Sequence, residues 1–333
     1  MKNLLKFAAI FALLPMIMLN SCSDDGDDPQ PEAQDRFDVL KTYMIDNNMD
    51  VSDVLVGWTT TSTDVYDAMT DAEAGNDVYI IDIRKADDFA ANRIEWAHNA
   101  PLADVVTTAA DAEGKPIVVV CYSGQTAGHA VMALRLSGYA DAKVMLWGMC
   151  SWNATTATAW NNAVANGNTA EGNANWVVPT GDIAADSPMT APTVEYVSDD
   201  GAEILKEQVS KMLTNGFKTV TNADVLGTPT NYFINNFWDA GDVETYGNIK
   251  TAHRIKPLTL ATGEYTSLDG TAKVVTYCWT GQTSSMLTAY LSVMGYDAYS
   301  LVYGANGMIY DNLTAHKFTT AATKDYPLTT GGK

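Results

Sequence analysis

The segment Cys121-Tyr122-Ser123-Gly124-Gln125-Thr126-Ala127 returns later in the chain as Cys278-Trp279-Thr280-Gly281-Gln282-Thr283-Ser284. Each copy follows a β-branched apolar run, at 117–120 and 274–276, and each precedes a helical pattern. The cysteine is therefore expected on a tight loop between a buried strand and the start of a helix. Loop amides and the positive helix end favour a thiolate at such a place, and any anion bound to its sulfur. This layout predicts a nucleophilic or sulfur-carrying cysteine.

The loop glycines, Gly124 and Gly281, are expected to permit a backbone conformation that is closed to residues with a Cβ atom. The loop amides and the helix end are also expected to lower the pKa of the Cys121 and Cys278 thiols. Both cysteines would then carry thiolate near neutral pH.

The repeat extends well beyond the cysteine loops, at an offset of 157 residues between the two cysteines. Downstream, Trp147-Gly148 corresponds to Tyr303-Gly304. Upstream, residues 78–84 align with 231–237, so that Asn235-Asn236-Phe237 stands where the first copy has Asp82-Ile83-Arg84. A repeat of this length indicates a duplicated domain rather than a solenoid unit.

Short apolar runs alternate with helical patterns in each copy, which is typical of α/β proteins with parallel sheets buried on both faces. Gly138 and Gly295 are placed to end the helices that follow the cysteines. We treat His129, on the first of these helices, as a surface residue. Strands are expected at 78–83, 117–121, 144–147, 231–235, 274–278 and 298–302, and further helices near 36–46, 150–165 and 202–214.

The first 21 residues have the features of an export signal. Two lysines precede an apolar run of 13 residues, Phe7 to Leu19, which is shorter than the ~20 residues that span a bilayer. The following Leu19-Asn20-Ser21-Cys22 resembles the lipobox of bacterial lipoproteins, which implies lipidation of Cys22. The acidic stretch after it resembles those of surface lipoproteins of Bacteroidetes, which implies a site at the outer membrane. The alternative is an ordinary secretory signal.

These features together predict the domain organisation. Residues 166–195 are rich in Asn, Ala, Gly, Thr and Pro and are read as a linker between the two copies. The expected parts are a signal peptide (1–21), a disordered acidic tether (22–34), domain one (35–165), the linker (166–195) and domain two (196–325).

The charge and the cysteine content of the chain argue against some classes of function. With 20 basic and 40 acidic residues, a net charge of −20 argues against nucleic-acid binding, which depends on neutralising phosphates. No Cys/His spacing suggests zinc, and we expect neither a metal nor a cofactor. With Cys22 acylated, three thiols remain, so at least one stays free. Cys150 is read as a core residue, the alternative being a resolving thiol for Cys121.

In order and in duplicate, these motifs resemble the rhodanese superfamily. The resemblance implies two tandem domains, each with a five-stranded parallel sheet flanked by helices. It also implies transfer of sulfane sulfur through a cysteine persulfide, from a thiosulfate- or polysulfide-like donor to a thiol or cyanide. Cys121 and Cys278 would be catalytic. Substrate-binding roles would fall to Tyr122, Ser123, Gly124, Gln125, Thr126, Trp279, Thr280, Gly281, Gln282 and Thr283.

The loops also depart from that pattern. Thr126 and Thr283 stand at the sixth position, where members active on thiosulfate often have arginine, so an anionic donor would lack its attraction. Phosphatase chemistry of the C-x5-R type is dismissed, because Ala127 and Ser284 stand where its arginine would be. The remaining alternative is a catalytically weak or inactive binding or scaffold module on the cell envelope.

Overall fold

The computed structural model describes residues 36–71, 76–185, 188–192 and 198–331. The expected signal peptide, the acidic tether and Cys22 lie outside the described residues. Within the described ranges, none of the helices is long and apolar enough to cross a membrane.

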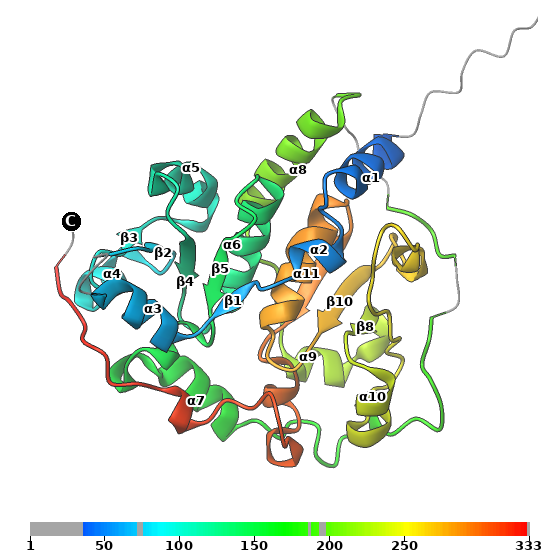
Figure 1. The fold of residues 1–333 in the computed structure, drawn as a ribbon. Helices are drawn as coiled ribbons and strands as arrows, with labels where there is room; N and C mark the ends of the chain where they lie inside the picture. The colour runs from blue at the N-terminus through cyan, green and yellow to red at the C-terminus, as the bar shows by residue number, and fades with distance from the viewer. Residues whose placement is uncertain (1–35, 72–75, 186–187, 193–197, 332–333) are drawn as a thin grey trace, which may run out of the picture. The chain divides into compact units, whose positions relative to one another are not determined.

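The first half of the chain forms a five-stranded parallel sheet with the order β1-β5-β4-β2-β3 (Figure 1). Strands β2 and β4 are buried along their whole length. Such burial requires continuous apolar runs, because helices cover both faces of a parallel sheet. The strands are β1 (Thr59–Thr60), β2 (Tyr79–Asp82), β3 (His98–Asn99), β4 (Ile117–Val120) and β5 (Lys143–Met145).

The second half repeats this order with four parallel strands, β7-β11-β10-β8. At the fifth position, a single parallel bridge between Asn235 and His253 stands in place of a strand. The next residue, Arg254, pairs with Ala184 of the connector, so the ladder does not continue along β8. The strands are β7 (Thr219–Val220), β8 (Phe233–Asn236), β10 (Lys273–Tyr277) and β11 (Asp297–Leu301).

The predicted helices are present, although the one expected near 150–165 begins only at Thr158, after two 3₁₀ turns. The helices after the two cysteines end where Gly138 and Gly295 follow with φ of +97° and +94°, as expected for residues that stop a helix. The helices are α1 (Arg36–Asp46), α2 (Val51–Val54), α3 (Ser62–Thr70), α4 (Ala86–Ala91), α5 (Val105–Ala109), α6 (Gln125–Leu136), α7 (Thr158–Ala165), α8 (Gly201–Asn215), α9 (Asn222–Gly227), α10 (Ala240–Tyr246) and α11 (Gln282–Val293).

The two helices that follow the cysteines pack against each other. Helices α6 and α11 are in contact, and α8 contacts both of them (Figure 1). The approach is close at Gly128, where a Cβ atom would lie 2.9 Å from the carbonyl oxygen of Gln282. Leu134 and Leu291 belong to one hydrophobic cluster that takes residues from both halves. The core is therefore continuous across the repeat.

His129 lies inside this contact rather than at the surface, so its assignment as a surface residue is wrong. Its imidazole ring is 5.2 Å from the ring of Phe217, and neither ring nitrogen has a hydrogen-bond partner among the described residues. Burial lowers the pKa of His129 to about 4. The reason for the error is that α6 is covered on all sides, so none of its faces is left for solvent.

The described part of the connector lies along the second half. β6 (Trp176–Val177) pairs with β9 (Asn248–Ile249) as a short antiparallel ladder. Further on, Asp182 forms an ion pair with Arg254, with 2.7 Å between the oxygen and the nitrogen. The domain boundaries 35–165 and 196–325 stay predictions.

The C-terminal segment returns to the first half, where it runs past α7 and α3 (red in Figure 1). The indole Nε1 of Trp152 donates a hydrogen bond of 2.8 Å to the carbonyl of Pro327. The ring of Tyr326 stacks on that of Tyr66 at 4.2 Å. The first half is thus completed by residues from the far end of the chain.

Candidate functional site: two cysteine loops

Each cysteine directly follows an inner strand of its sheet, β4 or β10, and precedes a helix of twelve residues. Gly124 and Gly281 precede the first residues of α6 and α11, with φ of +84° and +77°. This region of φ is costly for residues with a Cβ atom, which confirms the expected role of both glycines. The cysteine sulfurs consequently lie beside the N-terminal amides of the two helices.

In the first half, two backbone amides donate to the sulfur of Cys121. The Gly124 nitrogen is 3.1 Å from Sγ, and the Ala127 nitrogen is 3.4 Å from it. The thiol is only 3 % exposed. Burial raises the pKa of the Cys121 thiol above its ordinary value of 9.0, while the amides act in the opposite direction and the charge of Asp82 adds to the rise. The expectation of a lowered pKa is therefore wrong for Cys121, because desolvation outweighs the amides.

The second half repeats these contacts and adds a hydroxyl. The amides of Gly281 and Ser284 lie 3.2 Å and 3.4 Å from the sulfur of Cys278, which is 2 % exposed. The hydroxyl of Ser284 lies 3.6 Å from the same sulfur and 2.8 Å from the hydroxyl of Ser300. Because Ala127 occupies the position of Ser284 in the first half, the Cys278 sulfur has the more polar surroundings.

A glycine from the end of the sheet packs against each cysteine loop. At Gly148, a Cβ atom would lie 2.6 Å from the amide nitrogen of Gly124 and still closer to the carbonyl oxygen of Cys121. Gly304 packs in the same way against the carbonyl oxygen of Cys278. No residue with a side chain fits at either position without displacement of the loop.

The loop glutamines are buried and reach across to the opposite half. Gln125 Oε1 accepts a hydrogen bond of 2.9 Å from the amide of Tyr303. Gln282 Oε1 accepts one of 3.1 Å from the amide of Trp147. The sequence contained one sign of this exchange, since the same glutamine occurs in both loops, but the partner of each could not be read from it.

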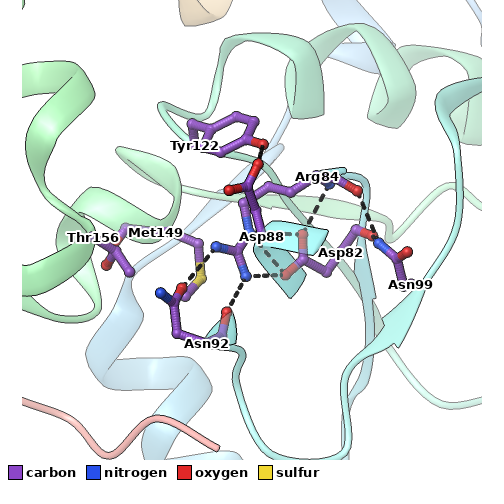
Figure 2. A network of polar contacts seen from close by, with 8 residues as sticks. All are labelled: Asp82, Arg84, Asp88, Asn92, Asn99, Tyr122, Met149 and Thr156. Atoms are coloured by element: carbon purple, nitrogen blue, oxygen red, sulfur yellow. Dashed lines mark hydrogen bonds and ion pairs between the residues drawn. The ribbon is translucent and has the colours of Figure 1, made fainter. Parts of the chain in front are cut away.

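A polar network around the buried pair of Asp82 and Arg84 supports the loop of the first half (Figure 2). The guanidinium of Arg84 forms an ion pair of 2.7 Å with Asp82 and also donates to Asn92, while Asn99 donates to the carbonyls of residues 82 and 84. Arg84 lies 5.9 Å from the ring centroid of Tyr122, whose hydroxyl donates to Asp88. Tyr122, the residue after Cys121, is therefore held by Arg84, which follows β2, and by Asp88 of α4.

The register of the sheets corrects the alignment of this network with the second half. Asp82 pairs with Val120, and Asn236 pairs with Tyr277, in each case the residue before the cysteine. Asn236 therefore corresponds to Asp82, one position later than the sequence alignment predicted, and Trp238 corresponds to Arg84.

Stacked rings take the place of the ion pair in the second half. The rings of Trp238 and Trp279 are 4.2 Å apart and nearly parallel, with 10° between their planes. Trp279 also stacks on His316, with 5.4 Å between the ring centroids. Trp279 is the counterpart of Tyr122, so the two halves support the same loop position by different chemistry.

The serine and threonines of the two loops complete the description of the predicted site residues. The carbonyl of Ser123 accepts a hydrogen bond of 2.9 Å from the indole of Trp160. Thr280 Oγ1 accepts from the amide of Gln282 at 3.3 Å. Thr126 and Thr283 are half-buried in the first turns of their helices.

Cys150 has the surroundings of a core residue. It is a free thiol, buried in a cluster with Trp160 and Phe318, with Trp147 and Tyr303 packed around them. Burial raises the pKa of Cys150 to about 11. The thiol is consequently protonated at neutral pH.

Comparison with known proteins gives one family match. Residues 62–155 match the family model described as "Rhodanese-like domain". Among curated proteins, no sequence matches the chain.

Solved structures give several distant likenesses. A rhodanese-related protein from Thermoplasma volcanium is 17% identical over 27% of this chain and 85% of its own, with a TM-score of 0.22. A protein from Staphylococcus saprophyticus is 21% identical over 27% of this chain and 88% of its own, with a TM-score of 0.24. A thiosulfate sulfurtransferase from Pseudomonas aeruginosa is 14% identical, with a TM-score of 0.28; the match covers 87% of this chain and 47% of that one.

The family match includes the network of Asp82 and Arg84, the loop of Cys121 and the glycine at position 148. The similarity to the rhodanese-like family therefore covers residues 62–155, the part of the first half that contains the Cys121 loop.

Proposed function

We propose that the chain is a sulfurtransferase that moves sulfane sulfur through persulfides on Cys121 and Cys278. The observation that carries the proposal is the convergence of backbone amides on each sulfur at a helix N-terminus. A persulfide is an anion at neutral pH, and such amides stabilise an anion without a dedicated cation. The family match of residues 62–155 supports the same chemistry for the first half.

The transfer consists of two displacements. The thiolate of Cys121 attacks the outer sulfur of a donor R–S–SH, a new S–S bond forms, and the donor leaves as R–S⁻ with the electron pair of the broken bond. An acceptor thiolate then attacks the outer sulfur of the cysteine persulfide. The cysteine thiolate is released, and the acceptor departs as its own persulfide; cyanide would depart as thiocyanate. The cysteine is unchanged after both steps.

The charge of the loops determines which donors fit. Neither loop contains Lys or Arg, and Thr126 and Thr283 occupy the sixth positions. A doubly charged donor such as thiosulfate gains no electrostatic attraction there, so its turnover is slow. Persulfidated thiols and organic polysulfides, whose sulfur chains carry one charge or none, are the better donors, and a thiol is the natural acceptor.

The two halves contribute unequally. The ion pair of Asp82 and Arg84 holds the support of the Cys121 loop in one geometry, whereas Trp238 supports the other loop by stacking alone. A fixed loop keeps its amides aimed at the sulfur, which favours the persulfide. Cys121 is therefore the more active cysteine.

The test is a sulfurtransferase assay on the wild type, Cys121→Ser, Cys278→Ser and the double variant, with thiosulfate and a polysulfide compared. Activity should fall mainly in Cys121→Ser, and the polysulfide should be the faster donor. Mass spectrometry of the purified protein should find an adduct of about 32 Da on the Cys121 peptide, as a persulfide requires. Equal activity of the wild type and the double variant with every donor would overturn the proposal and leave a binding or scaffold module.

We also propose that Cys22 is lipidated and anchors the chain at the outer membrane. The proposal rests on the apolar run before Cys22 and the acidic stretch after it. Cys22→Ala should leave the exported protein unlipidated and free of the membrane fraction. Labelling of that variant with palmitate, or its retention in membranes, would contradict the anchor.

A further inference from the structure

Two bulky residues adopt a backbone conformation that normally belongs to glycine. Trp147 has a φ of +67° and Tyr303 a φ of +60°, at corresponding places just after the last strand of each sheet. This left-handed region is unfavourable for residues with large side chains. Such conformations persist only where the surroundings hold them in place.

The loop glutamine of the opposite half holds each of these residues. Gln282 accepts from the amide of Trp147 at 3.1 Å, and Gln125 accepts from the amide of Tyr303 at 2.9 Å. The two glutamines are 0 % and 4 % exposed. Water cannot easily replace these acceptors in a buried site, so loss of either would leave an amide unsatisfied.

The residues that directly follow Trp147 and Tyr303 contact the cysteine loop of the same half. Gly148 follows Trp147 and packs against the loop, and the next amide, that of Met149, donates 2.9 Å to the carbonyl of Cys121. In the second half, the amide of Ala305 donates 3.0 Å to the carbonyl of Cys278. Gln282 is therefore linked to Cys121 through the three consecutive residues 147–149: it binds the first of them, and the other two contact the cysteine loop.

We propose that the glutamines are positioning residues that act crosswise. Gln282 fixes the loop of Cys121, and Gln125 fixes the loop of Cys278, although each glutamine stands only four residues from the cysteine of its own loop. The two thiols are thus coupled: a change in one loop that moves its glutamine releases the support of the other loop.

One contact favours a role of Gln125 in its own loop instead, and this makes the proposal testable. The Nε2 of Gln125 donates to the hydroxyl of Ser123 at 3.2 Å, within its own loop. If that local contact were the important one, replacement of Gln125 would affect Cys121 first. Crosswise action requires that Cys278 responds first.

The experiment measures the alkylation rate of each cysteine by peptide mass spectrometry in the wild type, Gln282→Met and Gln125→Met. Methionine keeps the length of the side chain and removes the acceptor. Because each thiol is buried, release of its loop should speed alkylation, by ~10-fold for one lost buried hydrogen bond. Gln282→Met should increase the alkylation rate of Cys121 and leave that of Cys278 unchanged. Gln125→Met should increase the rate of Cys278 and leave that of Cys121 unchanged.

Gln208→Met is the matched control, since Gln208 is a buried glutamine of α8 and its side-chain nitrogen has no hydrogen-bond partner among the described residues. It should leave both rates as in the wild type. If either methionine variant fails to fold, Gln282→Asn and Gln125→Asn replace it. Asparagine is one methylene shorter, so its oxygen no longer reaches the amide, and the same change in alkylation rate is expected. Acceleration in the same half, or equal acceleration at both cysteines, overturns the proposal. Alkylation needs no sulfur donor, so the result stands apart from whether the chain transfers sulfur.

Discussion

Arg84 and Trp238 occupy the same position in the two halves, and each lies against the residue that follows a cysteine. Arg84 lies 5.9 Å from the ring of Tyr122, and Trp238 stacks on Trp279 at 4.2 Å. One half uses a buried ion pair and the other a purely aromatic contact at this place. The buried charge is therefore not a requirement of the fold, and its energetic role can be tested in the half that has it.

Asp82→Asn should lower the free energy of unfolding by about 3–5 kcal/mol, because it leaves the buried guanidinium of Arg84 without its counter-charge. The double variant Asp82→Asn/Arg84→Met should lose less than the single variant. Urea unfolding of both gives the comparison. Asp297→Asn, which breaks the half-exposed pair with Lys218, is the control and should change stability by less than ~1 kcal/mol. A double variant less stable than Asp82→Asn would contradict this view of the pair.

The buried ring of His129 should make the protein sensitive to acid. Its pKa is about 4 in the folded chain, against the ordinary value of 6.5, so the unfolded chain binds the proton first as the pH falls. Stability should decline from pH 6.5 downward, with about 3 kcal/mol lost to this group by pH 4. His129→Leu should flatten that part of the profile, as measured by urea unfolding at a series of pH values. Parallel profiles for the variant and the wild type would show that His129 is not the group responsible.

Gly128 should be intolerant of a side chain, because α6 and α11 approach each other there. In Gly128→Ala, the added Cβ atom would lie 2.9 Å from the Gln282 carbonyl, and the variant should lose about 1–3 kcal/mol of stability. Gly227→Ala is the matched control, since Gly227 ends helix α9 and its Cβ atom would meet open space. Thermal melts should show a lower Tm for the first variant and no decrease for the second. A gain in Tm for Gly128→Ala would mean that the two helices separate more easily than their packing indicates.

Alkylation of Cys121 should keep rising with pH beyond 9.0. Burial raises the pKa of this thiol, so the reactive thiolate remains a minor form through the neutral range. Below the pKa, the rate should increase by about tenfold per pH unit. Peptide mass spectrometry after timed alkylation measures it, with circular dichroism to verify the fold at each pH. A rate that levels off below pH 8 is the opposite result.

Local patterns in the sequence predicted the elements and the cysteine loops well. The apolar runs became strands, and the loop glycines took positive φ, because both depend on neighbouring residues alone. Tertiary features were predicted less well. Asn236 and Trp238 carry no charge, unlike Asp82 and Arg84, so the sequence offered no matching residues to fix the alignment, and it was wrong by one residue. The burial of His129 and the exchange of glutamines arise from the contact between α6 and α11, which no local pattern encodes.

The return of the C-terminal segment bears on how the chain reaches its fold during synthesis. Trp152 belongs to the core of the first half, yet the carbonyl that satisfies its indole comes from Pro327, 175 residues later. During synthesis, the whole first half leaves the ribosome long before Pro327 is made. The first half therefore lacks these contacts until synthesis is nearly complete, and their formation would be a late, long-range step of folding.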